Sequence, residues 1–338
     1  MLRVETAGVL PVKELDRLFG PFQTVSSRLG APRTEFNFYR IPSAVSFGAP
    51  MAVAGRLHEN SLFAVRESVT YDEELQSFLA LPAGRDWAVA ASLPGEWFAL
   101  NSAWAGGFWH WMMECIPRAY LLERTGYTGG YLVPDGGSFI LDSLRLLGID
   151  AARVQVSRGA VTVLETLVVS TPFLGQFDFD HFPEMFFGLR ERLLAAAACE
   201  CPPLEPHRRL YIARAQSRRV LNEPDFLEVI GRHGFGGAQL MERYPLAHQI
   251  QMARDAHVVI GPHGAGMTLT MLMPPGSAVI ELFPPTYINP CMTATARHLR
   301  QRHHAVPARV MVPNQAYQHG TDIVADLRTI DQILDSLT

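Results

Sequence analysis

The pattern of apolar and polar residues is most regular within residues 257–283. An apolar run at 258–260 leads into three glycines within 261–266. A mostly apolar stretch then ends at a Pro-Pro-Gly sequence and gives way to a second apolar run at 278–283. This order predicts a buried strand, a glycine-rich turn, a short helix and a second buried strand.

Helical and strand patterns alternate over much of the remaining chain. Residues 1–100 mix short apolar runs with many turns and give no clear pattern. Beyond them we expect helices at 108–124, 138–147, 223–233 and 245–256, and strands at 129–135, 153–156, 164–170, 209–213 and 239–241. Such alternation is typical of α/β proteins, and the elements after residue 207 favour a doubly wound domain.

The chain length favours two domains. A chain of 338 residues is too long for one typical core. The prolines between residues 202 and 206 bar both helix and central strand. We therefore predict an N-terminal α/β domain at 1–200, a second α/β domain at 201–320, and an amphipathic closing helix at 321–338.

Composition excludes several classes of function. A hydrophobic content of 48%, a charged content of 18% and a formal charge of −4 are typical of a compact soluble protein. Such a charge gives no overall attraction to nucleic acid or to an anionic membrane. Lys13 is the only lysine, which makes Schiff-base chemistry and a pyridoxal cofactor poor candidates.

The four cysteines have neither the spacing of a zinc site nor the density of a secreted disulfide framework, which indicates a reducing compartment. The first residues hold no apolar core of signal-peptide length, and no uninterrupted apolar stretch reaches about 18 residues. We expect a cytoplasmic protein without an integral membrane segment. Peripheral membrane association and the oligomeric state stay open.

The glycine-rich turn is a candidate phosphate site. Glycines let the backbone approach a ligand, and the helix start supplies unpaired N–H groups. The spacing Gly-x-x-Gly-x-Gly is neither the dinucleotide fingerprint nor a Walker loop, and many such turns bind nothing. His263 lies among the glycines and could donate to a phosphate or sugar oxygen, unless it only caps the turn.

A second candidate site lies near residue 110. If the chain is helical from Phe108, then His110, Glu114 and Arg118 are spaced i, i+4 and i+8 on one face. Pro117 weakens this geometry. Neighbouring tryptophans and methionines would desolvate the carboxylate, which favours Glu114 as a general base. The alternative is an ordinary ion pair on a helix surface.

Arginines follow the predicted strand at 209–213, at the end where open α/β sheets bind ligands. Arg214 and Arg219 could clamp a diphosphate there. For Arg208, Arg209 and Arg218, solvated surface charge is the alternative. The Asp-Phe-Asp sequence at 178–180 is too short to establish a metal-bound diphosphate. We predict no metal site.

Hydrolysis is a rival hypothesis. The sequence His-Gly-Ala-Gly from His263 is similar to the oxyanion loop of esterases. In those enzymes it accompanies a Gly-x-Ser-x-Gly nucleophile, which this sequence lacks.

Three motifs in this order resemble glycosyltransferase family 61. They are residues 108–118, residues 209–214 with Arg219 and Asn222-Glu223, and residues 261–266 continued through 281–284. The resemblance implies a GT-B-like fold, in which two Rossmann-like domains face each other across a cleft. It also implies a nucleotide-sugar donor in the second domain, a glycan or other hydroxyl acceptor in the first, inversion at the anomeric carbon, and no required metal or other cofactor.

The resemblance assigns roles to particular residues. Glu114 or, as a second choice, His110 would remove the acceptor proton. The remaining assignments are donor binding by Arg214, Arg219, His263, Gly264, Ala265, Gly266 and Glu281, with Glu281 on the ribose, and acceptor contacts by Asn101, Trp109 and Arg118. The family often has aspartate in place of Glu114. Bacterial surface polysaccharide biosynthesis is the expected context, and a non-catalytic nucleotide-sugar-binding protein is the competing hypothesis.

Overall fold

The structure is a computed structural model of the 338-residue chain. The chain forms two compact units, unit 1 at residues 1–189 and unit 2 at 190–338. The structure describes residues 2–3, 5–10, 12–26, 35–46, 53–58, 61–65, 86–102, 104–158, 161–201, 208–311 and 319–337.

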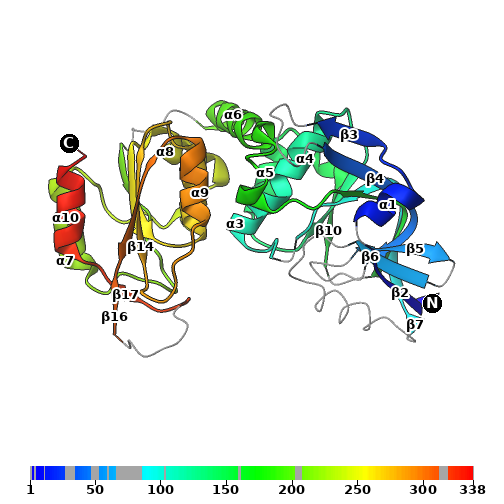
Figure 1. Cartoon of the computed structure of the whole chain (residues 1–338), viewed down its shortest axis with the longest axis horizontal. Coiled ribbons are helices and arrows are strands. Elements are labelled where there is room, and N and C mark those ends of the chain that lie inside the picture. The colour runs from blue at the N-terminus through cyan, green and yellow to red at the C-terminus, as the bar shows by residue number, and fades with distance from the viewer. Residues whose placement is uncertain are drawn as a thin grey trace. The chain divides into compact units, whose positions relative to one another are not determined.

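Unit 1 is built on a mixed sheet of nine strands among the described residues (Figure 1). The order along the sheet is β10-β9-β8-β11-β4-β5-β6-β2, and β3 pairs with β4. The strands are β2 (Glu5–Leu10), β3 (Gln23–Ser26), β4 (Glu35–Ser46), β5 (Val53–His58), β6 (Ser61–Val65), β8 (Val89–Ala99), β9 (Gly130–Pro134), β10 (Val154–Ser157) and β11 (Val161–Ser170). A small separate sheet joins β1 (Leu2–Arg3) to β7 (Asp86–Trp87).

The helices of unit 1 connect these strands. They are α1 (Val12–Leu18), α3 (Phe108–His110), the π-helical turn η1 (Trp111–Cys115), α4 (Ile116–Glu123), α5 (Phe139–Leu146) and the 3-10 turns η2 (Ala151–Arg153) and η3 (Gly175–Phe177). Helix α6 (Pro183–Glu200) begins in unit 1 and continues into unit 2.

Both faces of the unit 1 sheet are covered. On one face Leu15 of α1 packs in a buried cluster with sheet residues such as Tyr39 and Leu167. The other face carries aromatic rings in edge-to-face contact. The centroids of Phe38 and Phe98 are 6.0 Å apart, as are those of Phe98 and Tyr131. Such packing on both faces fixes the positions of the strand ends.

The strand order of unit 1 reverses beside β8. Strands β8, β9, β10 and β11 run parallel. From β8 the chain adds β9 and β10 on one side, and β11 then returns to the other side of β8. Ligands of open α/β sheets bind at such a reversal, beyond the carboxyl ends of the strands. In unit 1 this point lies between the ends of β8 and β11.

Unit 2 contains four parallel strands in sequence order. They are β12 (Arg209–Tyr211), β13 (Val258–Pro262), β14 (Ala278–Phe283) and β15 (Arg302–Pro307). Just after β12, Ile212 also forms a parallel bridge to Gln239, on the side away from β13. The chain therefore leaves β12 to one side and later returns to the other. The strand order reverses between β12 and β13.

Helices cover both faces of the unit 2 sheet. Figure 1 shows α7 (Glu223–Arg232) and α10 (Leu327–Asp335) on one face, and α8 (Leu246–Asp255) and α9 (Cys291–His298) on the other. The short elements are the 3-10 helices η4 (Met241–Arg243) and η5 (Ala265–Leu272) and the strand pair β16 (Arg309–Val310) and β17 (Ile323–Val324).

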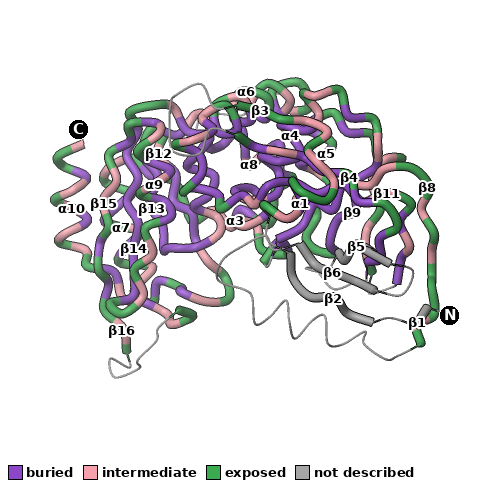
Figure 2. The backbone as a smooth tube through the Cα atoms, turned by 45° about the vertical axis from the view of Figure 1, so that its right-hand side comes forward, coloured by how far each residue is buried: buried purple, intermediate pink, exposed green. Residues whose placement is uncertain are grey.

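The core of unit 2 explains its apolar runs. Every residue of β13 and β14 is buried, and Figure 2 shows both strands in the colour of buried residues. Ile260 and Ile280 pack with Phe226 of α7 and Ile330 of α10. Parallel strands covered by helices on both faces read as near-continuous apolar runs, which is the pattern seen at 258–260 and 278–283.

Most predicted elements after residue 128 are confirmed to within a few residues. They are the strands predicted at 129–135, 153–156, 164–170, 209–213, 258–260 and 278–283 and the helices predicted at 138–147, 223–233 and 245–256. The structure is a mixed α/β protein with parallel strands in both large sheets. No helix in the described ranges is long and apolar enough to cross a bilayer.

Two predicted elements differ from the structure. The predicted strand at 239–241 is a single bridge at Gln239 followed by the turn η4, because pairing with the β12 segment ends after one residue. The closing helix begins at Leu327, where Asp326 accepts a hydrogen bond from the backbone N–H of Thr329. The preceding β-branched residues 323–324 instead form β17.

Truncation of Ile330 tests the packing of α10. Ile330 has no exposed surface and belongs to the unit 2 core, so Ile330→Ala should lower the free energy of unfolding of unit 2 by about 2–5 kcal/mol. Gln332→Ala, an exposed change on the same helix, should shift it by less than about 0.5 kcal/mol. Urea denaturation measures both. Equal midpoints for the two variants would contradict this packing.

Candidate functional site

In unit 2, the loops leaving β12 and β13 meet where the strand order reverses. The guanidinium of Arg214 lies over Gly264, where any Cβ would collide with it. Arg214 Nε donates to the carbonyl oxygen of Ser217 at 2.8 Å. Burial lowers the pKa of Arg214, and the charge of Glu242 opposes that shift, but a guanidinium stays charged at neutral pH. A fixed positive charge therefore lies at the glycine-rich turn.

The other two glycines of the turn accommodate protein atoms. A Cβ on Gly261 would lie 2.5 Å from the carbonyl oxygen of Ile212, and one on Gly266 would lie 3.1 Å from Ile212 Cγ2. The missing side chains of Gly261 and Gly266 therefore make room for Ile212, and the approach of a ligand to this backbone stays a prediction. The 3-10 helix η5 follows from Ala265, and its first N–H groups have no partner within the helix.

Arg190 holds the far end of η5. Its Nε donates to the carbonyl of Met271 at 3.1 Å and its Nη2 to the carbonyl of Met273 at 2.8 Å. Burial lowers the pKa of Arg190. This cap satisfies carbonyls that a helix end leaves unpaired, and so fixes the turn from its C-terminal side.

A buried carboxylate holds His263. Glu281 Oε1 lies 2.6 Å from His263 Nδ1, and Oε2 lies 2.9 Å from Nε2 of His303. Glu281 has no exposed surface, and both imidazoles are more than nine-tenths buried. Because a carboxylate only accepts hydrogen bonds, His263 donates from Nδ1. Its Nε2 is left to interact with a ligand.

This geometry corrects the assignment of Glu281 to the ribose. Both carboxylate oxygens are engaged and the side chain is inaccessible, so the contact expected with ribose is replaced by support of His263. His303 was missed from the sequence. It lies in the fourth parallel strand, whose polar and charged start hides the strand pattern.

Aromatic rings surround His263. Phe283 stacks on it with ring centroids 5.0 Å apart, and the ring of Tyr287 lies at 5.4 Å. The ring centroid of His319 lies 4.7 Å from that of Tyr287. The guanidinium carbon of Arg218 lies 5.9 Å from the Tyr287 ring centroid. Tyr287 therefore joins groups from three loops into one cluster.

Two arginines and two histidines converge here. Burial lowers the pKa of His319, and the charges of Arg218, His263 and Arg214 lower it further. Arg218 is buried and has a φ of 58°, a left-handed conformation that is strained for a residue with a side chain. Two guanidinium charges with neighbouring imidazole donors suit the binding of an anion. We call Arg214, Arg218, His263 and His319 the basic cluster.

Arg219, expected to bind a diphosphate, forms an ion pair with Asp322. Its Nε donates to Asp322 Oδ2 at 2.9 Å, and its backbone N–H donates to Oδ1 of the same residue at 2.9 Å. The hydrogen bond from Arg219 lowers the pKa of Asp322. Arg219 thus fixes the segment before β17, while the buried neighbour Arg218 contributes to the basic cluster.

In unit 1, the candidate base lies on an irregular helix. The predicted helix at 108–124 is interrupted by η1, in which the N–H of Ile116 bonds to the carbonyl of Trp111. Pro117 explains the wide turn, because proline has no N–H and its ring clashes with the carbonyl four residues earlier. π-helical turns occur often at functional sites.

His110 and Glu114 are adjacent and accessible. His110 Nδ1 lies 3.1 Å from Glu114 Oε1, and their side chains are 32% and 15% exposed. The nitrogen is off the direction that a hydrogen bond requires, and it bonds to no other described residue. The predicted juxtaposition of these two side chains is confirmed, and solvent reaches both.

Arg118 does not extend this pair. Its Nε donates to the backbone carbonyl of Glu114 at 2.7 Å, and its Nη2 donates to the backbone carbonyl of Asn101. Arg118 is almost fully buried. The expected acceptor contact is therefore replaced by a structural one, in which the side chain ties the loop after β8 to the carboxylate-bearing turn.

The other expected acceptor residues lie close to His110. The ring centroid of Trp109 is 4.7 Å from that of His110. Asn101 is buried and its Oδ1 accepts a hydrogen bond from the backbone N–H of Ser102. The ring centroid of Trp104, which sequence reasoning did not select, lies 6.4 Å from that of His110.

Sequence reasoning also missed the turn η3 after β11. Gly175 has a φ of 56°, and a Cβ there would lie 3.5 Å from Glu114 Cγ. A glycine shortly after a predicted strand was the only available signal. Asp178 closes this turn by accepting a hydrogen bond from the N–H of Leu174 at 2.6 Å. No cluster of three potential metal-ligating side chains occurs among the described residues.

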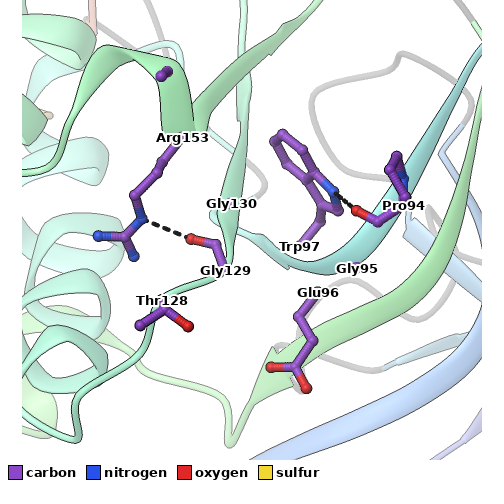
Figure 3. Close-up of a pocket in the computed structure, with 9 residues that line it drawn as sticks. Pro94, Gly95, Glu96, Trp97, Thr128, Gly129, Gly130 and Arg153 are labelled. Carbon is purple, nitrogen blue, oxygen red and sulfur yellow. Dashed lines mark hydrogen bonds between the residues drawn. The ribbon is translucent and has the colours of Figure 1, made fainter.

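A separate cavity lies at the opposite edge of the unit 1 sheet. It has a volume of about 370 Å³ and is bordered by Trp97, Gly130 and Arg153 (Figure 3). Gly130 begins β9 and Arg153 precedes β10, so the cavity faces the amino ends of these strands. Arg153 is bonded to Glu123 and to the carbonyl of Gly129. The charged side chain that borders the cavity is therefore already hydrogen-bonded within the protein.

A comparison with protein families shows which family the chain belongs to. The sequence model of the family Glycosyltransferase 61 matches residues 108–280, more than half of the chain. The chain belongs to the glycosyltransferase 61 family. The matched range of this family member begins at the first residue of α3, includes His110, Glu114, Arg214 and His263, and ends one residue before Glu281.

One curated relative is an EGF domain-specific O-linked N-acetylglucosamine transferase of Drosophila melanogaster. This glycosyltransferase 61 family member is 32% identical to it over 85 residues, which make up 24% of the chain and 16% of the relative. The chain thus spans a small part of the relative that it matches.

Neutralising Glu281 in this family member tests how His263 is held. In Glu281→Gln the amide nitrogen is a donor, so one of the two imidazoles must turn or change tautomer. We expect altered ¹⁵N chemical shifts of the His263 ring and a free energy of unfolding lower by about 1–3 kcal/mol. The exposed control Glu228→Gln should change neither. Unaltered His263 shifts in Glu281→Gln would contradict the hydrogen bond.

Proposed function

We propose that the protein is an inverting glycosyltransferase that moves a sugar from a nucleotide-sugar to a hydroxyl of a glycan or other acceptor, in bacterial surface polysaccharide biosynthesis. The observation that carries the proposal is the convergence of Arg214, Arg218, His263 and His319 where the strand order of unit 2 reverses. Membership of the glycosyltransferase 61 family supports it.

We further propose a GT-B arrangement, with unit 1 on the acceptor side and unit 2 on the donor side. Each unit supplies support of its own. In both, parallel strands change order once, and the candidate residues follow the carboxyl ends of the strands beside that change. In unit 2 helices cover both faces of the sheet, as in Rossmann-like domains.

In the proposed donor site the diphosphate contacts the basic cluster. Arg214 offers a guanidinium held over Gly264, and His263 offers Nε2 with its ring orientation fixed by Glu281. The amides of Ala265 and Gly266 at the start of η5 add donors. These groups neutralise the charge that develops on the leaving diphosphate, with no metal or other cofactor in the proposed reaction.

In the proposed reaction the acceptor oxygen forms a bond to the anomeric carbon. The bond from that carbon to the diphosphate oxygen breaks, and its electron pair leaves with the nucleoside diphosphate. The acceptor proton passes to the Glu114 carboxylate, which solvent and ligands can reach. His110 lies beside Glu114 and can carry the proton onward.

A donor screen tests this function. Thermal shift with uridine, guanosine, cytidine and adenosine diphosphate sugars should identify one that raises the melting temperature, because a ligand of the native state stabilises it. That donor should then hydrolyse slowly without acceptor. A nucleotide-sugar that binds but never hydrolyses would favour the non-catalytic alternative. Binding of none of them would overturn the proposal.

Glu114→Gln should separate chemistry from binding. Removal of a general base lowers transfer by roughly 10²–10⁴-fold, while the donor dissociation constant should stay within about twofold because the basic cluster is intact. Glu184→Gln, which changes an exposed carboxylate of α6, is the matched control and should keep full activity. Full transfer by Glu114→Gln would remove this residue from the mechanism.

Donor binding should depend on pH through His319. Its pKa lies below the usual value, so the ring is mostly neutral at neutral pH. A nearby diphosphate favours the imidazolium form, so binding takes up a proton and tightens as the pH falls towards the pKa of the ring. Calorimetry of nucleoside diphosphate binding in buffers of different ionisation enthalpy measures this uptake. His319→Gln should reduce it, and the exposed control His257→Gln should not. Equal uptake in both variants would place His319 outside the anion site.

A further inference from the structure

The hydrogen bonds of Glu281 belong to a longer chain within unit 2. Nδ1 of His303 lies 3.2 Å from Oγ1 of Thr293, an exposed residue of α9. Nε2 of the same ring contacts Glu281, whose other oxygen contacts His263 at the glycine-rich turn. Polar groups in hydrogen-bond contact therefore connect the exposed surface of α9 to the basic cluster.

The register of the sheet explains this arrangement. His303 of β15 pairs with Val279 of β14, two residues before Glu281. Because side chains alternate along a strand, Val279 and Glu281 point to the same face of the sheet. Ile280 and Leu282 belong to the core beneath α7 and α10. Glu281 and His303 therefore lie on the opposite face, which carries α9.

The directions of these hydrogen bonds restrict where the protons lie. A carboxylate only accepts, so His263 donates to Glu281 from Nδ1 and His303 donates from Nε2. In a neutral His303 ring the other nitrogen, Nδ1, accepts from the hydroxyl of Thr293. In a neutral His263 ring the other nitrogen, Nε2, cannot donate to a phosphate oxygen. A hydrogen bond from His263 to an anion therefore requires protons on both nitrogens of its ring.

The surroundings of His263 oppose a positive charge on its ring. Burial lowers the pKa of the neighbouring His319, and the charges of Arg218, His263 and Arg214 lower it further. The two guanidinium charges act in the same sense on His263, because like charges disfavour each other at short range. Glu281 is fully buried, lies 2.6 Å from the ring and supplies the opposing negative charge.

The other groups around Glu281 leave its charge to His263. On α9, burial and then the charge of Glu281 raise the pKa of Cys291 to about 12, so this thiol stays neutral. A carboxylate compensates one imidazolium, and a second imidazolium would leave an excess positive charge in a buried site. His303 therefore serves as a neutral donor, whose N–H stabilises the ionised carboxylate without competing for its charge.

We propose that His303 is a positioning residue, which keeps Glu281 ionised so that His263 binds the donor diphosphate as an imidazolium. His263 takes up one proton from solvent when the diphosphate binds, and its Nε2 then donates to a phosphate oxygen. Without His303, the buried Oε2 of Glu281 would lose its donor. A proton would then move from His263 to the carboxylate, and the ring would lose its charge. This role rests on the proposed function and deepens its donor site.

Nitrogen NMR of the full chain with ¹⁵N-labelled histidine tests the charge of His263, with inorganic pyrophosphate as the probe. At saturation and neutral pH, both ring nitrogens of His263 should show the chemical shifts of protonated imidazole nitrogens. His303 should show one protonated and one unprotonated nitrogen. An unprotonated ring nitrogen on His263 in this complex, or a charged His303 ring, would overturn the proposal.

Two substitutions of His303 separate hydrogen-bond donation from the filling of space. His303→Leu removes the donor and should weaken pyrophosphate binding about tenfold, with loss of the imidazolium shifts of His263. His303→Gln keeps an N–H for Oε2 of Glu281, so its dissociation constant should stay within about threefold of the wild-type value. His304→Leu changes the next residue of β15, whose side chain points to the opposite face, and as the control should bind as the wild type does. Unweakened binding by His303→Leu, or equal weakening by His303→Gln, would contradict the role of His303.

Failure of this proposal can be told from failure of the proposed function. Absence of pyrophosphate binding by the wild type overturns the donor site and this inference together. Binding with a neutral His263 overturns the inference alone. Absence of donor hydrolysis, with the expected pyrophosphate results, overturns the transferase and leaves the role of His303 in place. The wild-type spectrum decides the charge of His263 even if His303→Leu does not fold.

Discussion

The reversal of strand order within each parallel sheet is the constraint on which the rest of the structure depends. Where two neighbouring parallel strands connect in opposite directions, their carboxyl ends are not covered by a crossover helix. In unit 2 this brings Arg214 and Gly264 together from segments 50 residues apart. In unit 1 it brings the turn at Gly175 against Glu114. The positions of both candidate sites, each within its own unit, follow from the order of the strands.

The buried carboxylate of Glu281 adds rigidity to the basic cluster. Burying a charge is costly unless it is paired and hydrogen-bonded, and here two imidazoles supply the partners. His263 gains a fixed orientation in return. Groups fixed in advance stabilise a developing charge without reorganising during the reaction. Arg218, with its strained backbone, and His319, with its lowered pKa, lie in the same cluster of residues.

Sequence patterns predicted the features that depend on residues close together in the chain. The strand, turn and strand within 257–283 and the proximity of His110 to Glu114 follow from spacing alone. Contacts between distant segments were not accessible in that way. His303 and His319 reach the site through long-range pairing, and the capture of Arg219 by Asp322 spans about a hundred residues. Spacing placed Arg118 on the right helix but could not show that its guanidinium bonds to backbone carbonyls.

Hydrogen–deuterium exchange with and without the stabilising nucleotide-sugar tests the central claim most directly, because it reports where the activated donor binds without relying on activity. The account predicts slower exchange at 212–219 and 263–267 of unit 2, around the basic cluster. Exchange beside the Trp97 cavity of unit 1 should not change. Protection confined to that cavity, or absent from both segments of unit 2, would contradict the account.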